Sequence, residues 1–175
     1  AEAGFEKADI GAIAAAPLVS DNRVVFAFHP AHNRGLTGCL EISEGKARLV
    51  WTSLDLANWW HSAVLYNGCV YGVDQGPQRP GNKIGALYCY DLESGELHWK
   101  TYDFDDRQLM TREGMFLIAD GKLIVAKVSP DGYKPLTSTQ VFRRARARIW
   151  TVPVLAGGRI YCRNGDGKLI CLDVR

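Results

Sequence analysis

Short apolar runs separated by two-residue polar turns recur along the chain, and one arrangement of them occurs four times. In each copy a short, mostly apolar run leads into the turn and a second apolar run follows it. The turn dipeptides are Asp-Asn, Asn-Gly, Asp-Gly and Gly-Gly, which tolerate the positive φ angles of a type I′ hairpin turn. The pattern therefore predicts four β-hairpins, at residues 17–26, 63–71, 116–124 and 153–161.

The spacing of these hairpins predicts how they assemble. By subtraction, the second turn residues are 46, 53 and 37 positions apart; they are Asn22, Gly68, Gly121 and Gly158. A repeat of roughly forty to fifty residues that begins with a hairpin has the size of one four-stranded blade of a β-propeller. The fold class expected is all-β, with about four blades of four-stranded antiparallel sheet.

A second shared block follows the hairpins. Cys39, Cys89 and Cys171 occupy the same place in it, each two residues before an acidic residue: Glu41, Asp91 or Asp173. The alternation around each cysteine is typical of a third strand that is half-buried between blades. The five cysteines of the chain include no CxxC pair and no histidine at zinc-ligand spacing, so we expect small buried strand residues, no disulfide framework and no metal site.

The same block continues into a turn and a tryptophan. Gly45 and Gly95 predict a tight turn into a fourth strand, which ends on Trp51 or Trp99. Because these tryptophans recur with the repeat, we interpret them as packing between adjacent blades. A stacking platform for a cofactor is the alternative.

These blocks resemble a known family. The segment 85–99, GALYCYDLESGELHW, resembles the pyrroloquinoline-quinone-like (PQQ-like) repeat, G-x-L-x-A-L-D-x-x-T-G-x-x-x-W, and residues 60–72 resemble its inner hairpin. The ending 159–173 is similar to the C-terminal blades of such proteins. The resemblance implies a β-propeller of the quinoprotein alcohol dehydrogenase-like superfamily, with this chain forming part of a larger, seven- or eight-bladed ring.

The repeats place the blades at about residues 13–57, 58–105, 110–142 and 147–175 of a single propeller segment, 1–175. In the third, Ala126 leads almost directly into the next apolar run, so we expect either a short blade or missing residues. The fourth ends after its third strand, and residues 1–12 are a weak candidate for the outer one. The pairing of two such halves is the alternative to one larger propeller, since an open stack of this kind would leave an apolar blade face exposed, which favours self-association.

The resemblance implies two functions. The superfamily contains eight-bladed quinoprotein alcohol dehydrogenases and also a non-catalytic propeller lipoprotein of the outer-membrane assembly machinery. The adjacent cysteines expected beside the quinone are missing from this chain, and no catalytic residue is predicted. We therefore favour a non-catalytic scaffold that binds a protein or small ligand. The alternative is a fragment of a PQQ-dependent dehydrogenase that oxidises alcohols or sugars, with PQQ and calcium as cofactors.

Composition narrows the possible partners. With 47% hydrophobic and 23% charged residues the chain has the make-up of a folded protein, and its net charge of +2 is too small to argue for nucleic acid or an anionic membrane. No apolar run is long enough for a transmembrane segment. The chain begins at Ala1 without a visible signal, so a periplasmic or extracellular location follows from the resemblance alone.

One cluster predicts a ligand site. Trp59, Trp60 and His61 directly precede the inner strand of the second blade, and Trp150 has the corresponding place in the last one. Inner strands begin at the mouth of a propeller's central channel, where aromatic rings and a histidine could hold an apolar or sugar-like ligand. The alternative is that Trp60 is the repeat's structural aromatic residue and His61 is hydrogen-bonded in the channel wall.

A second cluster is basic. Arg143, Arg144, Arg146 and Arg148 lie between the third and fourth blades and could bind phosphate or carboxylate groups through their planar guanidinium donors. The alternative is a solvated loop.

Overall fold

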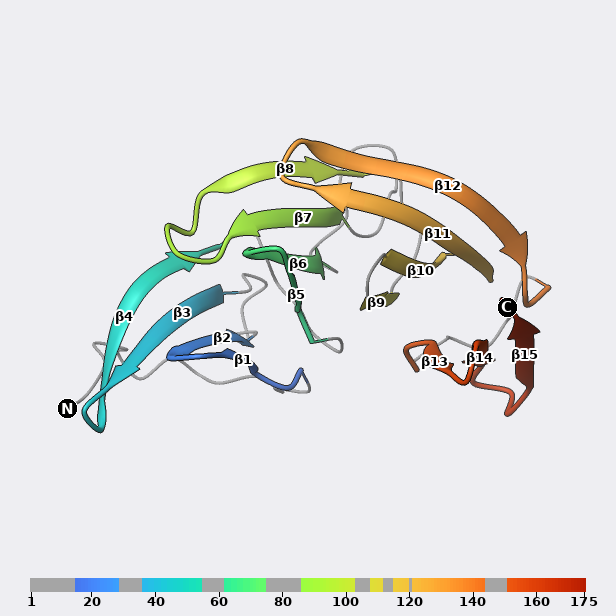
Figure 1. The fold of residues 1–175 in the computed structure, drawn as a ribbon, viewed down its shortest axis with the longest axis horizontal. Helices are drawn as coiled ribbons and strands as arrows, with labels where there is room; N and C mark the ends of the chain where they lie inside the picture. The colour runs from blue at the N-terminus through green and yellow to red at the C-terminus, as the bar shows by residue number, and fades with distance from the viewer. Residues whose placement is uncertain are drawn as a thin grey trace.

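The protein is built entirely from β-strands wherever its structure is described. The computed structural model describes residues 15–28, 36–54, 62–74, 86–102, 108–111, 115–119, 121–143 and 151–175. Strands in these ranges form four separate antiparallel sheets (Figure 1). No helix in the described part of the chain is long and apolar enough to cross a membrane. The predicted all-β fold of about four blades is confirmed.

Each sheet is one blade, and its strands follow one another in chain order. Blade 1 comprises β1 (Leu18–Ser20), β2 (Arg23–Phe28), β3 (Leu36–Ser43) and β4 (Lys46–Ser53). Blade 2 comprises β5 (Val64–Tyr66), β6 (Cys69–Asp74), β7 (Ala86–Asp91) and β8 (Leu97–Thr101). Blade 3 comprises β9 (Gln108–Thr111), β10 (Met115–Ala119), β11 (Lys122–Ser129) and β12 (Gly132–Gln140). Blade 4 comprises β13 (Val154–Ala156), β14 (Arg159–Arg163) and β15 (Leu169–Asp173).

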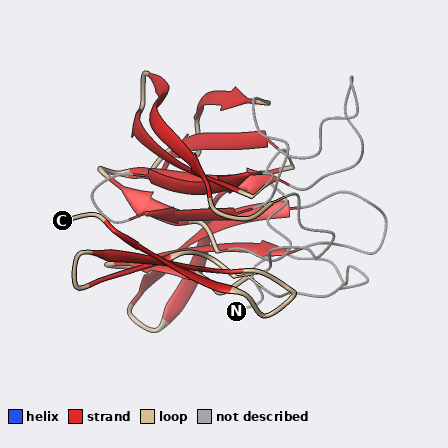
Figure 2. Ribbon diagram, turned by 90° about the vertical axis from the view of Figure 1, so that its right-hand side faces the viewer, coloured by secondary structure: helices blue, strands red, loops and turns tan. Residues whose placement is uncertain are grey.

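The blades stand side by side along an open arc (Figure 1). The first strands lie on the inside of this arc, where β1 contacts β5 and β5 contacts β9. The last strands lie on the outside, where β8 contacts β12. The view turned by 90° shows the blades as stacked layers of strands (Figure 2). Among the described sheets, two blade faces, one at each end of the arc, therefore have no neighbouring blade.

The hairpin turns follow the predicted chemistry. In the turn between β5 and β6, Asn67 and Gly68 have φ angles of 47° and 74°. Gly157 and Gly158 have φ angles of 56° and 70° in the turn between β13 and β14. Both residues of each turn are thus in the left-handed region that a type I′ turn requires.

The third blade corrects a sequence prediction. It is not short, because it contains four strands. The predicted hairpin over 116–124 joins β10 to β11, the second and third strands, whereas the corresponding hairpins of the other blades join the first and second. The additional strand β9 pairs with β10 on the inner side, so the hairpin is displaced one strand outward.

Rows of cross-strand partners form the contact between blades 1 and 2. Leu18 pairs with Val25, Val25 with Cys39, and Cys39 with Trp51, so the four side chains share one face of blade 1. They pack against buried side chains of blade 2: Val70, Ala86, Tyr88, Tyr90 and Leu92. Burial of this apolar area is the main force that holds one blade to the next.

Blade 2 repeats this row on the face that it presents to blade 3. The row consists of Val64, Tyr71, Cys89 and Trp99. It packs against Ala126 and Val128 of β11 and against Tyr133 of β12. Blade 4 packs on blade 3 in a separate cluster, formed by Leu123, Val141, Phe142, Ile160 and Cys162.

The rows of blades 1 and 2 each end in a tryptophan that donates a hydrogen bond to the next blade. The Nε1 atom of Trp51 donates a hydrogen bond to the backbone oxygen of Leu92 at 2.8 Å. The Nε1 atom of Trp99 donates to the backbone oxygen of Ser129, also at 2.8 Å. Both acceptors lie at the turn between the third and fourth strands of the following blade. The interpretation of these tryptophans as packing between blades is confirmed.

The cysteines agree with the sequence prediction except at one position. All five are free thiols, and Cys39, Cys69, Cys89 and Cys162 are buried. Cys171 is exposed, although it holds the same place in its repeat as Cys39 and Cys89. The reason is that its face of blade 4 is an end of the arc, where no further blade among the described residues covers it.

We predict that Gly95→Ala destabilises the protein more than Gly45→Ala. Both glycines have φ near 70° at equivalent turns, so each alanine costs about 1–2 kcal/mol from the left-handed backbone. A Cβ atom at Gly95 would also lie 2.4 Å from Cγ of Trp51, whereas a Cβ atom at Gly45 would have no heavy atom of the described structure within 4 Å apart from its chain neighbours. Overpacking adds roughly 1–3 kcal/mol. Urea denaturation of both variants at one protein concentration measures the difference, and equal losses would contradict the packing of Trp51 beneath this turn.

We also predict that the native protein in dilute solution exposes one fast-reacting thiol. Cys171 should react with a thiol reagent, and the four buried cysteines should react only after unfolding. Titration with a chromogenic disulfide, with and without guanidinium, counts the reactive thiols in the native and unfolded protein. Peptide mass spectrometry then identifies the labelled cysteines. Rapid labelling of Cys39 or Cys89 in the native state would show that the blades do not pack as described.

Candidate functional site

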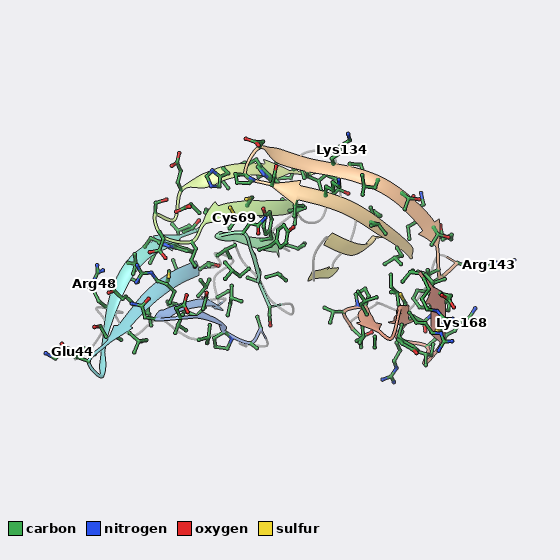
Figure 3. The ribbon with its side chains drawn as sticks, in the orientation of Figure 1. Glu44, Arg48, Cys69, Lys134, Arg143 and Lys168 are labelled. Carbon is green, nitrogen blue, oxygen red and sulfur yellow. The ribbon has the colours of Figure 1, made fainter. Side chains whose placement is uncertain are left out.

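The predicted ligand and anion sites fall largely outside the described residues. Trp59, Trp60, His61 and Trp150 are all outside them, so the channel-mouth site stays a prediction. Of the basic cluster, Arg143 is described, and it is exposed just after the buried Phe142 (Figure 3). Its proposed partners are outside the described residues: Arg144, Arg146 and Arg148.

The described surface contains a groove on the outer part of blade 3. It has a volume of about 390 Å³ and is open to solvent. Ile124 of β11 and Tyr133 of β12 form its inner part, and they also pack against the core between blades 2 and 3. The remaining lining comes from consecutive residues of β12: Pro135, Leu136, Thr137 and Ser138. The groove therefore follows one strand.

The strand that lines this groove is the outer edge of its sheet. β12 pairs with β11 on one side and has no strand on the other among the described residues. Its residues from Lys134 onward are exposed, and Leu136 retains 52% of its exposure in spite of being apolar. An edge strand presents unpaired backbone donors and acceptors, to which an extended segment of another polypeptide can add.

The local sequence restricts how such a segment can bind. Pro135 has no backbone N–H, and the pairing of β11 with β12 shifts by one residue between Val125 and Ala126. A proline and a bulge are common means of preventing uncontrolled pairing at an edge. The arrangement leaves Thr137 to Gln140 as the regular part of the edge, with Leu136 as the adjacent apolar anchor. Chemically, the site can hold an extended peptide with an apolar side chain.

The sequence pattern did not predict this groove. In the sequence pattern the third blade looks short, so its complete fourth strand is not apparent, and the pattern does not show Leu136 as an exposed residue on an outer strand. The available signal was the alternation of apolar and polar residues on both sides of Pro130-Asp131-Gly132, which is a turn between two strands.

Charged residues near the outer rim connect blades rather than line a pocket. Arg23 of blade 1 donates from Nε to Glu93 of blade 2 at 3.0 Å and lies 3.2 Å from Glu41 on its own sheet. Glu41 also pairs with Arg48. Hydrogen bonding to Arg48 holds the pKa of Glu41 below its ordinary value, and Arg23 adds to this effect. Arg23 and Glu41 are half-buried, but their partners Glu93 and Arg48 are exposed, so each pair stabilises the protein only modestly.

Asp91 organises the turn that receives Trp51. Its Oδ1 atom accepts hydrogen bonds from the backbone N–H of Ser94 at 2.7 Å, from the Ser94 hydroxyl at 2.8 Å and from the backbone N–H of Glu93 at 3.1 Å. The bond from the Ser94 backbone is the largest cause of a lowered Asp91 pKa. This carboxylate has a structural role, as its place in the repeat indicated.

A buried group of thiols and a phenol lies between blades 2 and 3. The Tyr71 hydroxyl is buried beside Cys69 and Cys89, without an oxygen or nitrogen partner. Burial is the main cause that raises the pKa of Cys89 to about 12, so the thiol is protonated at neutral pH. A protonated, enclosed thiol is a poor nucleophile and metal ligand, and this group forms part of the apolar contact between blades 2 and 3.

The described side chains do not fit a quinone or calcium site. Within these residues no group of three or more His, Cys, Asp and Glu side chains is placed to hold a metal ion. The buried cysteines lie on separate strands, and none of them is next to another in the sequence. No reaction step through such a cofactor follows from this geometry.

Comparisons with known proteins agree with the architecture. The family model described as outer membrane protein assembly factor BamB matches residues 2–101. The solved structure of the computationally designed Ika4 protein aligns with a TM-score of 0.65 at 13% identity, covering 98% of this chain and 95% of that one. A europium-containing methanol dehydrogenase gives a TM-score of 0.44 at 11% identity, covering 97% of this chain and 24% of its own. No curated protein matches the chain.

We predict that Asp91→Asn lowers the free energy of unfolding near neutral pH. The variant should also lose less of this free energy than the wild type as the pH falls. Because the folded-state pKa of Asp91 is lowered, its stabilisation is complete above the unfolded-state value of about 4 and disappears as the pH falls through the folded-state value. Urea denaturation across this pH range should show the curves of the wild type and the variant converging in acid. Asp131→Asn, in the corresponding exposed turn of blade 3, is the control, and a similar effect there would contradict a special role for Asp91.

Proposed function

Because the chain belongs to the family of PQQ-like propeller repeats described as outer membrane protein assembly factor BamB, we propose that it is a non-catalytic propeller scaffold that binds a protein partner. The partner in this proposal contributes an extended segment to the outer edge of blade 3. The family name supports a role in protein assembly, and the groove beside β12 supports the site. A periplasmic location fits this proposal.

The observation that carries the proposal is the exposed apolar side chain of Leu136 on β12, which has only β11 as a neighbour in its sheet among the described strands. The tryptophan and charged side chains of the inter-blade contacts already have partners within the fold. Leu136, by contrast, is half-exposed in a groove that Ile124 and Tyr133 also line. Apolar exposure next to unpaired backbone is the combination that strand-addition sites use for affinity and specificity.

The channel mouth is proposed as a second contact of the same scaffold. Trp59, Trp60, His61 and Trp150 offer aromatic surface to a protein loop or a small ligand. Arg143 and the arginines that follow it offer donors for carboxylate or phosphate groups.

Peptide selection tests the main site. Linear peptides displayed on phage and selected on the purified chain should include binders with one apolar anchor, and Leu136→Lys should abolish their binding. Leu54→Lys makes the same substitution at a leucine that is 62% exposed, just after β4 in blade 1 and away from the groove, and it should retain binding. Isothermal titration calorimetry of the selected peptides with both variants measures the difference.

Two results would overturn the proposal. If the selected peptides bind Leu136→Lys and the wild type equally well, the groove is not the binding site. Reduction of an electron-acceptor dye by the purified chain, dependent on PQQ and calcium, would replace the scaffold with a dehydrogenase. The dye assay is run with an alcohol and with an aldose as substrate.

A further inference from the structure

The net charge of +2 is the sum of an acidic part and a basic part of the chain. Residues 1–120 contain ten Lys and Arg residues and sixteen Asp and Glu residues, so they carry a net charge of −6. Residues 121–165 contain nine basic residues and one acidic residue, Asp131, which gives +8, and residues 166–175 are balanced. The basic part includes both outer strands of blade 3, β11 and β12. A surface of one charge attracts partners of the opposite charge.

Basic side chains of these two strands lie at both ends of the groove. Lys127 and Lys134 are cross-strand partners near the turn that joins β11 to β12. Lys122 pairs with Gln140 at the other end of β12, and it lies on the same face of the sheet as Ile124, which lines the groove. All three lysines are exposed. A segment that added to this edge would therefore have a positive side chain near each of its ends.

These lysines have no acidic partner within the described fold. In blade 1 the third and fourth strands place Glu41 opposite Arg48, and the two residues form an ion pair. In blade 3 the third and fourth strands place Lys127 opposite Lys134, and like charges directly opposite each other are unfavourable. No ion pair joins either lysine, or Lys122, to an acidic residue that the structure describes. A carboxylate from a partner would remove this repulsion.

The edge of β12 lies on the outside of the arc, away from the two faces at its ends (Figure 1). Figure 3 shows Lys134 on this outer side. Blades that continued the stack at either end would pack on the end faces and leave the edge accessible. From Lys134 to Gln140 the strand extends about 20 Å, at roughly 3.3 Å per residue, which is the length of an extended segment of about seven residues.

We propose that the segment which adds to β12 is acidic, with an apolar side chain near its middle and Asp or Glu residues toward both ends. This inference rests on the proposed binding of an extended segment at this edge. The apolar side chain contacts Leu136 in the groove. One carboxylate lies near Lys122, and another lies between Lys127 and Lys134. Because the side chains of an extended strand alternate between the two faces of a sheet, one segment reaches all of these positions.

The apolar groove favours a polypeptide over a phosphate polymer as the anionic partner. Strand addition combines backbone hydrogen bonds with pockets for alternate side chains, and Leu136 and Ile124 offer such a pocket. Single-stranded nucleic acids bind instead through positive grooves with aromatic side chains on which the bases stack. Tyr133 is the one aromatic residue that lines this groove, and it also packs against the core between blades 2 and 3.

The peptides selected on the purified chain provide the first test. Their sequences should be enriched in Asp and Glu and depleted of Lys and Arg relative to the unselected library. Fluorescence anisotropy then measures their dissociation constants. These constants should rise about tenfold between roughly 0.05 M and 0.5 M sodium chloride, because salt screens exposed charges.

Charge reversal locates the contact. The double variant Lys127→Glu with Lys134→Glu should weaken binding of the acidic peptides about tenfold, and it keeps a like-charged pair at this position of the sheet. Lys46→Glu makes the same substitution at an exposed residue of β4 in blade 1 and should leave the affinity unchanged. Leu136→Ser removes the apolar anchor without a change of charge and should also weaken binding. Circular dichroism establishes that each variant keeps its β-structure.

The outcomes distinguish the acidic segment from the groove itself. Binders that are neutral or basic, or that are insensitive to salt and to the double variant, would overturn the acidic segment, and the groove would stand if Leu136→Ser still weakened their binding. Binding that does not depend on Leu136 would overturn the groove, and a selection without binders would overturn both. Displacement of the peptides by oligothymidylate or by vesicles of phosphatidylglycerol, with the same dependence on Lys127 and Lys134, would replace the acidic segment with a phosphate-bearing ligand.

Discussion

The indole that links each outer strand to the next blade is the interaction on which the fold depends most. Trp51 is largely buried, stacks on Tyr90 and donates its single N–H to a backbone oxygen of blade 2. A buried N–H without an acceptor would cost more than the bond contributes, so the turn that offers the oxygen must have a fixed shape. Asp91 and Gly95 provide that shape, one by accepting turn hydrogen bonds and the other by leaving room for the ring.

This dependence explains why a blade is stable only beside another. Each sheet has a leading and a trailing apolar face, and neither is buried within the blade itself. At the ends of the arc the same positions that form the core elsewhere become solvent-exposed, as Cys171 and Val19 show. The composition of the end faces is therefore a property of the repeat, and their exposure is a property of where the arc stops. Any apolar partner that continues the stack of blades would satisfy the same physical requirement.

Blade 3 shows how a functional surface arises from a departure from the repeat. The strand β9 shifts the hairpin outward, and the long strand β12 becomes an exposed outer edge. Ser129 still offers its carbonyl oxygen to Trp99, so the contact with blade 2 is preserved. The consequence is a complete inter-blade contact together with an outer groove along β12, a strand of nine residues whose counterpart in blade 2, β8, has five.

Local sequence determined the hairpins, the turn glycines, the position of the repeat cysteines and the packing role of Trp51 and Trp99, because each depends on residues close together in the chain. Turn dipeptides and two-residue alternation act over a few positions, so they can be recognised without knowledge of the neighbours. Only the tertiary structure decided that the hairpin of blade 3 is its middle pair, that Leu136 lies in a groove and that Cys171 is exposed. These features depend on which sheet lies against which, and the same cysteine pattern is buried in blade 2 and open in blade 4 because only the neighbouring blade differs.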